Sequence, residues 1–222
     1  MAGKVAAFRV PFQIIFGNGA AERVGEEARR LGATHVFVLS DPNLQKLGVT
    51  ERIVASISSQ GIRPTVYTGI EFEPSVQSIA PVLAVAKEAG CDLVVGLGGG
   101  STLDTAKAVA MLLRNAGQTE DYLGIGLVKQ RGIPSILMPT TGGTGAEITP
   151  NALFYVPAAR EKKAIVSPHI IPDVAIVDPA LTVTVSPTVT AATGVDALSH
   201  AVESYTSLNA SPLTDLYALE AI

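Results

Sequence analysis

The sequence predicts an α/β fold in which a doubly wound parallel sheet carries helices on both faces. Short apolar runs rich in Val, Ile and Leu alternate with longer amphipathic stretches through residues 8–138, as expected when buried parallel strands alternate with crossover helices. Glycine-containing segments follow several of these runs directly. The chain is 47% hydrophobic, with 21 glycines but only 5% aromatic residues, a composition typical of α/β domains.

The first half of the chain supplies this alternation. A turn signal at Gly17-Asn18-Gly19 ends the first apolar run, because glycine and asparagine favour tight turns. Later runs are followed by stretches with charges on one side, as in helices packed on a sheet. The expected strands are 8–16, 35–39, 64–68 and 93–97, and the expected helices are 20–31, 44–60, 76–89 and the stretch that follows residue 100 as far as residue 112.

The second half adds strands and then changes to helix. Ser186-Pro187 is a good helix start, since serine caps a helix and proline fits its first turn, and we expect this helix to continue to residue 205. We therefore divide the chain into an α/β domain, 1–185, and the start of a helical domain, 186–222. The strands expected before that boundary are 133–138, 152–156, 163–166 and 174–177.

Residues 98–101, Gly-Gly-Gly-Ser, directly follow the apolar run 93–97 and precede a helix for which Ser101 is the expected N-cap. Strand, glycine turn and helix N-terminus together form an arrangement that binds phosphate. Free backbone N–H groups and the positive end of the helix dipole face the anion there. The spacing is neither that of G-x-G-x-x-G nor that of a P-loop, and taken alone the segment is equally consistent with a tight turn.

Two further loops follow expected strands. Residues 139–149 interleave four threonines with three glycines, which provides hydroxyl donors and acceptors on a backbone that bends tightly. Such a loop suits the phosphate and ribose groups of a nucleotide, and a surface loop is the alternative. Asp41 follows the strand 35–39, where a carboxylate accepts hydrogen bonds from ribose hydroxyls. The alternative for Asp41 is an Asp-Pro turn.

Asp196 and His200 are four residues apart in the expected C-terminal helix, so their side chains lie on the same face. A carboxylate oxygen and an imidazole nitrogen that converge in this way form half of a divalent-metal site, because a tetrahedral site needs about four ligands. The remaining histidines, His35 and His169, lie in segments that give no reason to expect them nearby. A surface salt bridge is the alternative.

Three motifs in this order identify a family. They are GGGSxxDxAK at 98–107, PTTGGTGAE at 139–147, and DPxLTxTxSPxxTAATGVDALSHAVESY at 178–205. The sequence resembles the group III, iron-containing alcohol dehydrogenases, and among them the lactaldehyde reductase-like branch. The resemblance covers essentially the whole chain and implies a Rossmann-like dinucleotide-binding fold followed by the first helices of an all-helical domain.

The resemblance implies roles for individual residues. It places the position that discriminates NAD from NADP at Asp41, so the expected cofactor is NAD. Asn151 would lie near the nicotinamide and the substrate, Leu181 against the adenine, and Lys162, or Lys163 beside it, at a ribose hydroxyl. The expected cofactor-binding residues are Asp41, Gly98, Gly99, Gly100, Ser101, Asp104, Thr140, Thr141, Thr144, Asn151, Lys162 and Leu181.

The resemblance also implies metal-centred chemistry. Asp196 and His200 would hold Fe²⁺, although an oxygen and nitrogen ligand set also accepts Zn²⁺ or another divalent ion. The ion would lower the pKa of a bound small alcohol, and hydride would pass to a nicotinamide that the protein orients. The reverse reaction would reduce an aldehyde. We therefore expect no catalytic side-chain nucleophile.

Composition excludes other classes of protein. A net charge of −4 without a Lys/Arg cluster argues against nucleic acid as a partner. The single cysteine, Cys91, rules out an internal disulfide and fits a reducing cytoplasm. No apolar run reaches the length of a membrane span, so we expect no membrane partner.

Members of the family continue for well over a hundred further residues, in a helical domain that supplies two more histidines. Residues 216–222 are apolar at helical spacing without a glycine C-cap. We therefore expect a truncated chain, a cleaved product or the ordered part of a longer protein. The apolar surface of residues 188–222 favours self-association, and a homo-oligomer, in the simplest case a dimer, is expected.

Three functions remain open at this point. The first is an NAD-dependent, metal-dependent dehydrogenase that acts on a small alcohol or aldehyde. The second is a nucleotide-binding fragment of such an enzyme without turnover. The third is a relative of the dehydroquinate synthase or glycerol dehydrogenase type. The absence of clustered Lys/Arg near Asp196 and His200 counts against a dehydroquinate synthase.

Overall fold

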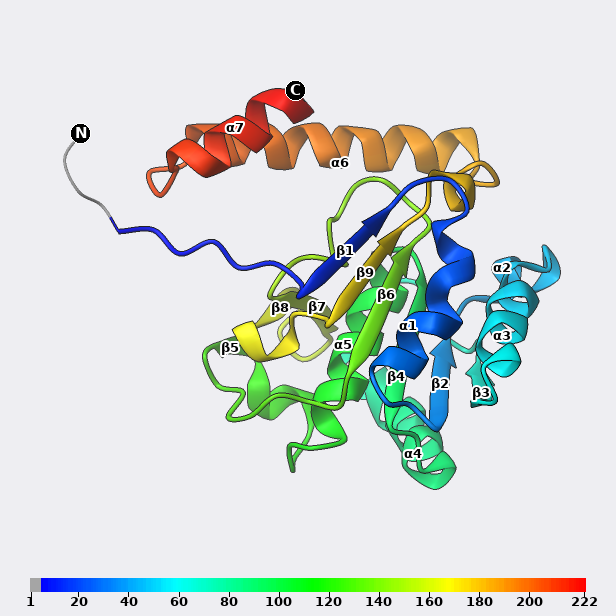
Figure 1. The fold of residues 1–222 in the computed structure, drawn as a ribbon. Helices are drawn as coiled ribbons and strands as arrows, with labels where there is room; N and C mark the ends of the chain where they lie inside the picture. Colours follow the sequence, from blue (N-terminus) through cyan, green and yellow to red (C-terminus); the bar gives the residue numbers. More distant parts are fainter. Residues whose placement is uncertain (1–4) are drawn as a thin grey trace.

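The structure is a computed structural model that describes residues 5–222. Its centre is a six-stranded sheet with the order β1-β9-β6-β4-β2-β3, in which all paired neighbours are parallel (Figure 1). The predicted α/β class with a parallel sheet is therefore confirmed. The strands are β1 (Gln13–Phe16), β2 (His35–Leu39), β3 (Arg63–Tyr67), β4 (Leu93–Gly98), β6 (Ser135–Pro139) and β9 (Val174–Val177).

Helices cover both faces of this sheet and create two separate cores. In β2, Val36 and Val38 face one core, whereas Phe37 and Leu39 face the other, because successive side chains of a strand point to opposite faces. Helices α4 and α5 pack on the side of Phe37, and α1 and α3 pack on the opposite side. The helices of this region are α1 (Val24–Arg30), α2 (Pro42–Lys46), α3 (Val49–Ser59), α4 (Ile79–Ala89) and α5 (Gly100–Leu112).

Several predicted boundaries were wrong for local reasons. Of the strand expected at 8–16, only β1 pairs with a neighbour. The helix expected at 44–60 is broken at Gly48, which adopts the left-handed φ of 72° between α2 and α3. Short 3₁₀ turns open the helices expected at 20–31 and 76–89. These turns and the other 3₁₀ elements are η1 (Ala20–Arg23), η2 (Val76–Ser78), η3 (Thr119–Tyr122), η4 (Pro168–Ile170) and η5 (Pro179–Thr182).

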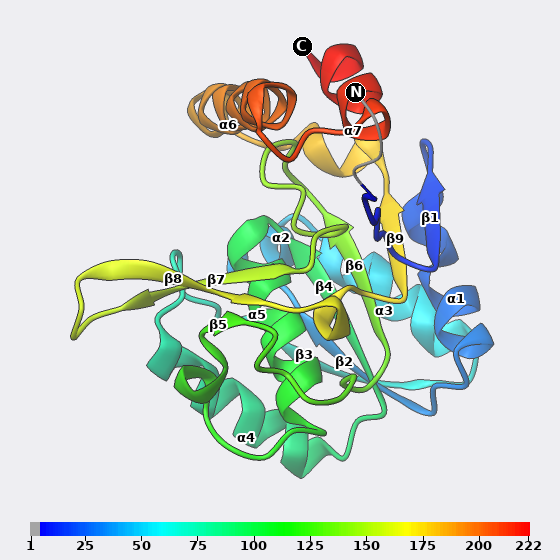
Figure 2. The ribbon, with the colours of Figure 1, turned by 90° about the vertical axis from the view of Figure 1, so that its left-hand side faces the viewer.

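A second, three-stranded sheet has the order β5-β8-β7 and consists of β5 (Gly124–Ile125), β7 (Asn151–Val156) and β8 (Glu161–Val166). The strands expected at 152–156 and 163–166 exist, but they form an antiparallel hairpin instead of joining the parallel sheet. Arg160, with φ of 52°, lies in the turn that connects them. Figure 2 shows this hairpin projecting away from the main sheet, while β7 packs against α5.

The C-terminal region consists of α6 (Pro187–Thr206) and α7 (Pro212–Ala221), which pack against each other. Ser186 caps α6 as predicted, since its side chain accepts a hydrogen bond from the Val189 amide. Figure 1 shows α6 lying across the edge of the sheet at which β1, β9 and β6 end. Within residues 5–222, no helix is both long enough and apolar enough to cross a membrane.

Candidate functional site

Three loops that the sequence singled out lie at one edge of the main sheet. They follow β2, β4 and β6, which are adjacent and parallel, so their carboxyl ends meet at the same edge. Along the chain, β3 is added on one side of β2 and β4 on the other. This reversal creates a topological switch point between β2 and β4, which is where open α/β sheets bind ligands.

The glycine turn after β4 leads into α5 without a side-chain cap. The predicted N-cap, Ser101, was wrong, because α5 begins at Gly100 and its N-cap is Gly99. The Gly99 carbonyl accepts from the amides of Thr102 at 3.0 Å and Leu103 at 3.1 Å. The earliest amides of α5 therefore point out of the helix without an intrahelical acceptor. Together with the helix dipole they offer a site for an anion.

The threonine loop after β6 lies directly over this turn. The Thr140 amide donates to the Gly98 carbonyl at 3.0 Å, which joins the two loops at their first residues. A Cβ atom at Gly100 would come within 2.9 Å of Thr144 Cγ2, and one at Gly99 within 3.6 Å of Thr141 Oγ1. Glycine is therefore required at position 100 if the threonine loop is to keep this position.

Asp41 has a structural role, as in the alternative of an Asp-Pro turn, because it begins a helix at Pro42. It is the N-cap of α2, and its Oδ1 accepts from the amides of Asn43 at 2.8 Å and Leu44 at 3.0 Å. Both bonds use the same oxygen, so Oδ2 takes no part in the cap. Asp41 is only half-buried, and its position after β2 is compatible with a second role towards a ribose.

Lys162 is linked to the glycine turn through an acidic residue, Glu73, that the sequence did not single out. Its Nζ lies 2.7 Å from Glu73 Oε1, and the Glu73 amide donates to Ser101 Oγ at 3.3 Å. Lys163, on the other face of β8, pairs with Glu161 at 3.1 Å. Because neighbouring residues of a strand face opposite sides, the geometry favours Lys162 over Lys163 near the cofactor loops.

Two other predicted cofactor residues lie in the interior. Leu181 is buried in the core on the side of α1 and α3. Asp104 is buried in α5, where its Oδ2 accepts from the Leu153 amide at 3.0 Å and its Oδ1 lies 3.4 Å from Lys107 Nζ. Both carboxylate oxygens of Asp104 thus have protein partners, and the bond to Leu153 connects α5 with β7.

Lys107 and Asp104, both buried, form with the half-buried Glu147 a charged cluster that sequence reasoning missed. Burial raises the pKa of Asp104 and of Glu147, while the positive charge of Lys107 opposes both increases. Burial lowers the pKa of Lys107, and Asp104 opposes that decrease. The signal in the sequence was a lysine at position 107 within the otherwise apolar stretch 106–112.

The two side chains predicted as a metal half-site, Asp196 and His200, lie side by side on α6 and are exposed. His200 Nε2 lies 3.7 Å from Asp196 Oδ1, and the two side chains are 54% and 41% exposed. Two ligands at about 2.1 Å from a tetrahedral ion lie about 3.4 Å apart, so this pair fits a divalent ion with little movement. Within residues 5–222, however, no group of three or more His, Cys, Asp or Glu side chains is arranged to hold a metal.

A close backbone contact places α6 beside the cofactor loops. A Cβ atom at Gly143 would come within 2.9 Å of the Thr193 carbonyl oxygen and of Thr193 Cβ. Thr193 precedes Asp196 by less than one helical turn. The threonine loop therefore touches the glycine turn on one side and α6 on the other.

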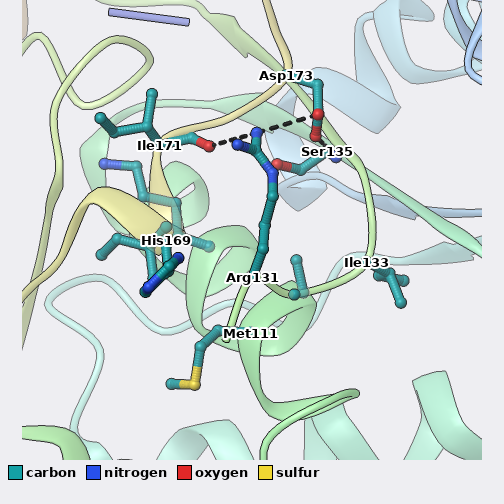
Figure 3. Close-up of a pocket in the computed structure, with 11 residues that line it drawn as sticks. Met111, Arg131, Ile133, Ser135, His169, Ile171 and Asp173 are labelled. Carbon is teal, nitrogen blue, oxygen red and sulfur yellow. Dashed lines mark hydrogen bonds and ion pairs between the residues drawn. The ribbon is translucent and has the colours of Figure 1, made fainter. Parts of the chain in front are cut away.

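A small cavity of about 10 Å³ lies elsewhere, at the amino-terminal ends of β6 and β9 (Figure 3). Arg131 crosses it and donates to the Ile171 carbonyl at 3.1 Å and to Asp173 at 3.0 Å. This volume holds about one water molecule. The cavity is therefore not a cofactor site.

Comparison with known proteins identifies relatives of the whole chain. The family model for iron-containing alcohol dehydrogenase matches residues 11–179, and the model for the C-terminal part of the Fe-containing alcohol dehydrogenase family matches residues 190–222. The long-chain-alcohol dehydrogenase 1 of Geobacillus thermodenitrificans is 43% identical over 209 residues, which cover 93% of this chain and 52% of that protein. The chain thus spans about half the length of this relative.

Solved structures agree with this result. A 1,3-propanediol oxidoreductase has a TM-score of 0.94 at 33% identity, over 98% of this chain and 57% of that one. A sulfoacetaldehyde reductase from Bifidobacterium kashiwanohense, solved in complex with NAD⁺, has a TM-score of 0.89 at 32% identity, over 97% and 57%. The resemblance stated from the three motifs is confirmed, and the chain belongs to the iron-containing alcohol dehydrogenase family.

Proposed function

We propose that this chain forms the NAD-binding part of a metal-dependent dehydrogenase and carries two ligands of its metal site. The enzyme would transfer hydride between NAD(H) and a small alcohol or aldehyde. The observation that carries the proposal is the threonine loop, residues 139–149, which contacts the glycine turn through Thr144 and α6 through Gly143. A dinucleotide bound at the glycine turn would thereby extend towards α6.

The roles proposed for the cofactor residues follow from their positions. The first amides of α5 and the surrounding glycines would bind the pyrophosphate. Asp41 Oδ2 would accept from ribose hydroxyls and disfavour a 2′-phosphate. Lys162, which Glu73 links to Ser101 of the turn, would reach a ribose hydroxyl. Asn151, at the start of β7, would lie at the nicotinamide.

The proposed metal ligands are Asp196 and His200, with further ligands from outside residues 5–222. An oxygen and a nitrogen donor suit Fe²⁺ and also Zn²⁺. A bound divalent ion would supply a Lewis acid that polarises the substrate oxygen. Asp196 and His200 are about half exposed on α6. The chain itself would contribute these two metal ligands. It would also orient the nicotinamide.

Cofactor choice gives a sharp test because Asp41 has two separable roles. Asparagine caps helices as well as aspartate does, so Asp41→Asn keeps the α2 cap and removes only the charge. We expect the wild-type chain to bind NADH more tightly than NADPH in fluorescence titrations, by about tenfold or more. In the Asp41→Asn variant, the difference between the affinities for NADH and NADPH should be smaller, and the thermal stability should be unchanged.

Two further results complete the test. Gly100→Val should abolish NADH binding, since its side chain would displace Thr144. Equal affinities of the wild-type chain for NADH and NADPH would contradict the proposed role of Asp41. Failure to bind either nucleotide would contradict the proposed function as a whole.

Binding without turnover is a second candidate for the chain taken alone. The observation in its favour is that residues 5–222 provide no group of three metal-ligating side chains. Measurement of NADH formation from small alcohols, with added Fe²⁺ or Zn²⁺, distinguishes the two candidates. Nucleotide binding without metal-dependent turnover would support the second.

Self-association is proposed on a separate observation. Helices α6 and α7 expose large apolar side chains, among them Val195, Leu216 and Leu219, and contiguous apolar surface of this kind favours contact with a partner. We expect a homo-oligomer, in the simplest case a dimer. Light scattering of the purified chain over a range of concentrations measures its mass directly.

A further inference from the structure

The side chain of Lys107 is fully buried in the middle of α5, a position that lysine occupies almost only when it is paired. Its ammonium group donates to the main-chain carbonyl of Asn151 at 2.5 Å. The same group lies 3.3 Å from Thr149 Oγ1 and 3.4 Å from Asp104 Oδ1. The shortest of these bonds therefore goes to the main chain of a residue expected at the nicotinamide.

Asp104 reinforces this bond from the same helix. Its second oxygen accepts from the Leu153 amide at 3.0 Å, so Asp104 and Lys107 hold the chain on both sides of Ala152. Burial would favour the neutral form of each partner when alone, and each charge opposes that effect on the other. The start of β7 is thus fixed to α5 by one charged donor and one charged acceptor.

Packing alone does not require this arrangement. Apolar side chains of similar volume hold a helix to a strand without the cost of burying charges. A charged hydrogen bond to one carbonyl additionally fixes the orientation of that peptide. Lys107 lies seven residues beyond Gly100, about 10 Å along the helix axis. Lys107 therefore bonds to Asn151 from beyond the first turn of α5, where the pyrophosphate is expected.

We propose that Lys107 is a positioning residue that holds the main chain of Asn151 so that its side chain meets the nicotinamide end of the dinucleotide. The inference rests on the proposed function, since it requires NAD in this site. Lys107 touches neither cofactor nor substrate in this proposal and acts only through Asn151. The adenosine end, at Asp41 and the glycine turn, does not depend on it.

Titrations with two ligands distinguish a positioning role of Lys107 from a purely structural role. NADH contains the nicotinamide, whereas ADP-ribose has the adenosine and the pyrophosphate but no nicotinamide. In Lys107→Met, we expect NADH affinity to fall about fivefold to tenfold, as for loss of one hydrogen bond. ADP-ribose affinity should stay within about twofold, because its contacts are distant from the change. Lys87→Met, on the exposed side of α4, is the matched control and should change neither.

A double-mutant cycle tests the route through Asn151. In an Asn151→Ala background, Lys107→Met should weaken NADH binding no further, since the side chain that it positions is gone. If Lys107→Met does not fold, a triple variant that also carries Asp104→Asn and Glu147→Gln replaces it. This variant has no buried carboxylate without its cation, and it still lacks the ammonium group that donates to Asn151. The same two titrations then apply to it.

The outcomes are distinct. Selective weakening of NADH that disappears in the Asn151→Ala background supports the inference. Equal weakening of NADH and ADP-ribose shows a purely structural lysine and overturns it, as does an unchanged affinity for both. A wild-type chain that binds neither ligand refutes the proposed function instead, which distinguishes the two failures.

Discussion

Two helices of this protein carry an acid–base pair at neighbouring turns, and the pairs differ in burial. Lys107 and Asp104 on α5 are 0% and 11% exposed, whereas His200 and Asp196 on α6 are 54% and 41% exposed. The buried pair has its polar atoms engaged by the main chain of β7. The exposed pair is the one for which we propose metal binding. The proposal therefore assigns ligand binding to the pair with the more exposed side chains.

The largest expected effect compares one aspartate from each pair. Asp104→Ala leaves a buried ammonium group and the Leu153 amide without their partner, which costs about 3–5 kcal/mol of unfolding free energy. Asp196→Ala breaks an exposed pair worth about 0–1 kcal/mol. Urea unfolding followed by circular dichroism measures both. Similar losses in the two variants would remove the distinction between the pairs.

The second prediction breaks the contact that joins the two regions. Gly143→Val pushes a branched side chain into Thr193, and overpacking of this kind costs about 1–3 kcal/mol. Gly142→Ala is the matched control, because a Cβ atom there meets nothing within 4 Å. Thermal unfolding should show a lower midpoint for Gly143→Val only. Equal midpoints would mean that α6 does not depend on this contact.

The third prediction concerns pH and the buried cluster. In Lys107→Met, Asp104 and Glu147 lose the cation that opposes the increase of their pKa by burial. A carboxyl group with a raised folded-state pKa contributes stability that is fully present below its ordinary pKa, 3.8 or 4.5 here. That stability is lost as the pH rises through the folded-state pKa. The unfolding free energy of the variant should therefore increase as the pH falls through the raised folded-state pKa values towards the ordinary values of 3.8 and 4.5.

This increase should approach about 1.4 kcal/mol per pH unit for each proton taken up. Urea unfolding at several pH values measures it, with Lys87→Met as the control, whose slope should be smaller because Lys107 still opposes both pKa increases. A Lys107→Met variant with the same pH dependence as the control would show that the two carboxyl groups are not coupled to Lys107.

The smallest expected effect belongs to an exposed ion pair. Lys162 and Glu73 are 53% and 57% exposed, so their coupling in a double-mutant cycle should be about 0–1 kcal/mol. The pair nevertheless links Lys162 to Ser101 of the glycine turn, because the Glu73 amide donates to Ser101 Oγ. Glu73→Ala should therefore leave the unfolding free energy nearly unchanged. A coupling energy clearly above about 1 kcal/mol would mean that Lys162 and Glu73 behave like the buried pair of Lys107 and Asp104.

The sequence predicted the fold and the meeting of three loops because both follow from local patterns. Runs such as 93–97 are apolar throughout since both faces of the sheet are covered, and parallel strands bring their carboxyl ends to one edge. The antiparallel pairing of β7 with β8 was not predictable in this way, because a short apolar run does not specify its partner.

The site was predicted less completely than the fold. Motif residues such as Gly100 and Thr144 were placed near each other correctly, because each begins or follows a strand–loop junction. The N-cap at Gly99 was missed because serine normally caps better than glycine, and the close approach of Thr144 is a tertiary constraint. Glu73 was missed for a similar reason: its contacts with Ser101 and Lys162 join segments far apart in the chain.

The contact between Gly143 and Thr193 separates two properties of α6, the position of its backbone and the character of its exposed surface. One side of the contact has no side chain, so the spacing between helix and loop depends mainly on the backbone. Substitutions at exposed positions of α6, such as Val195 and Leu198, can change the shape and polarity of the helix surface without moving its backbone. The exposed surface of α6 can therefore change without movement of the helix, whereas a side chain at position 143 would require the helix or the loop to shift.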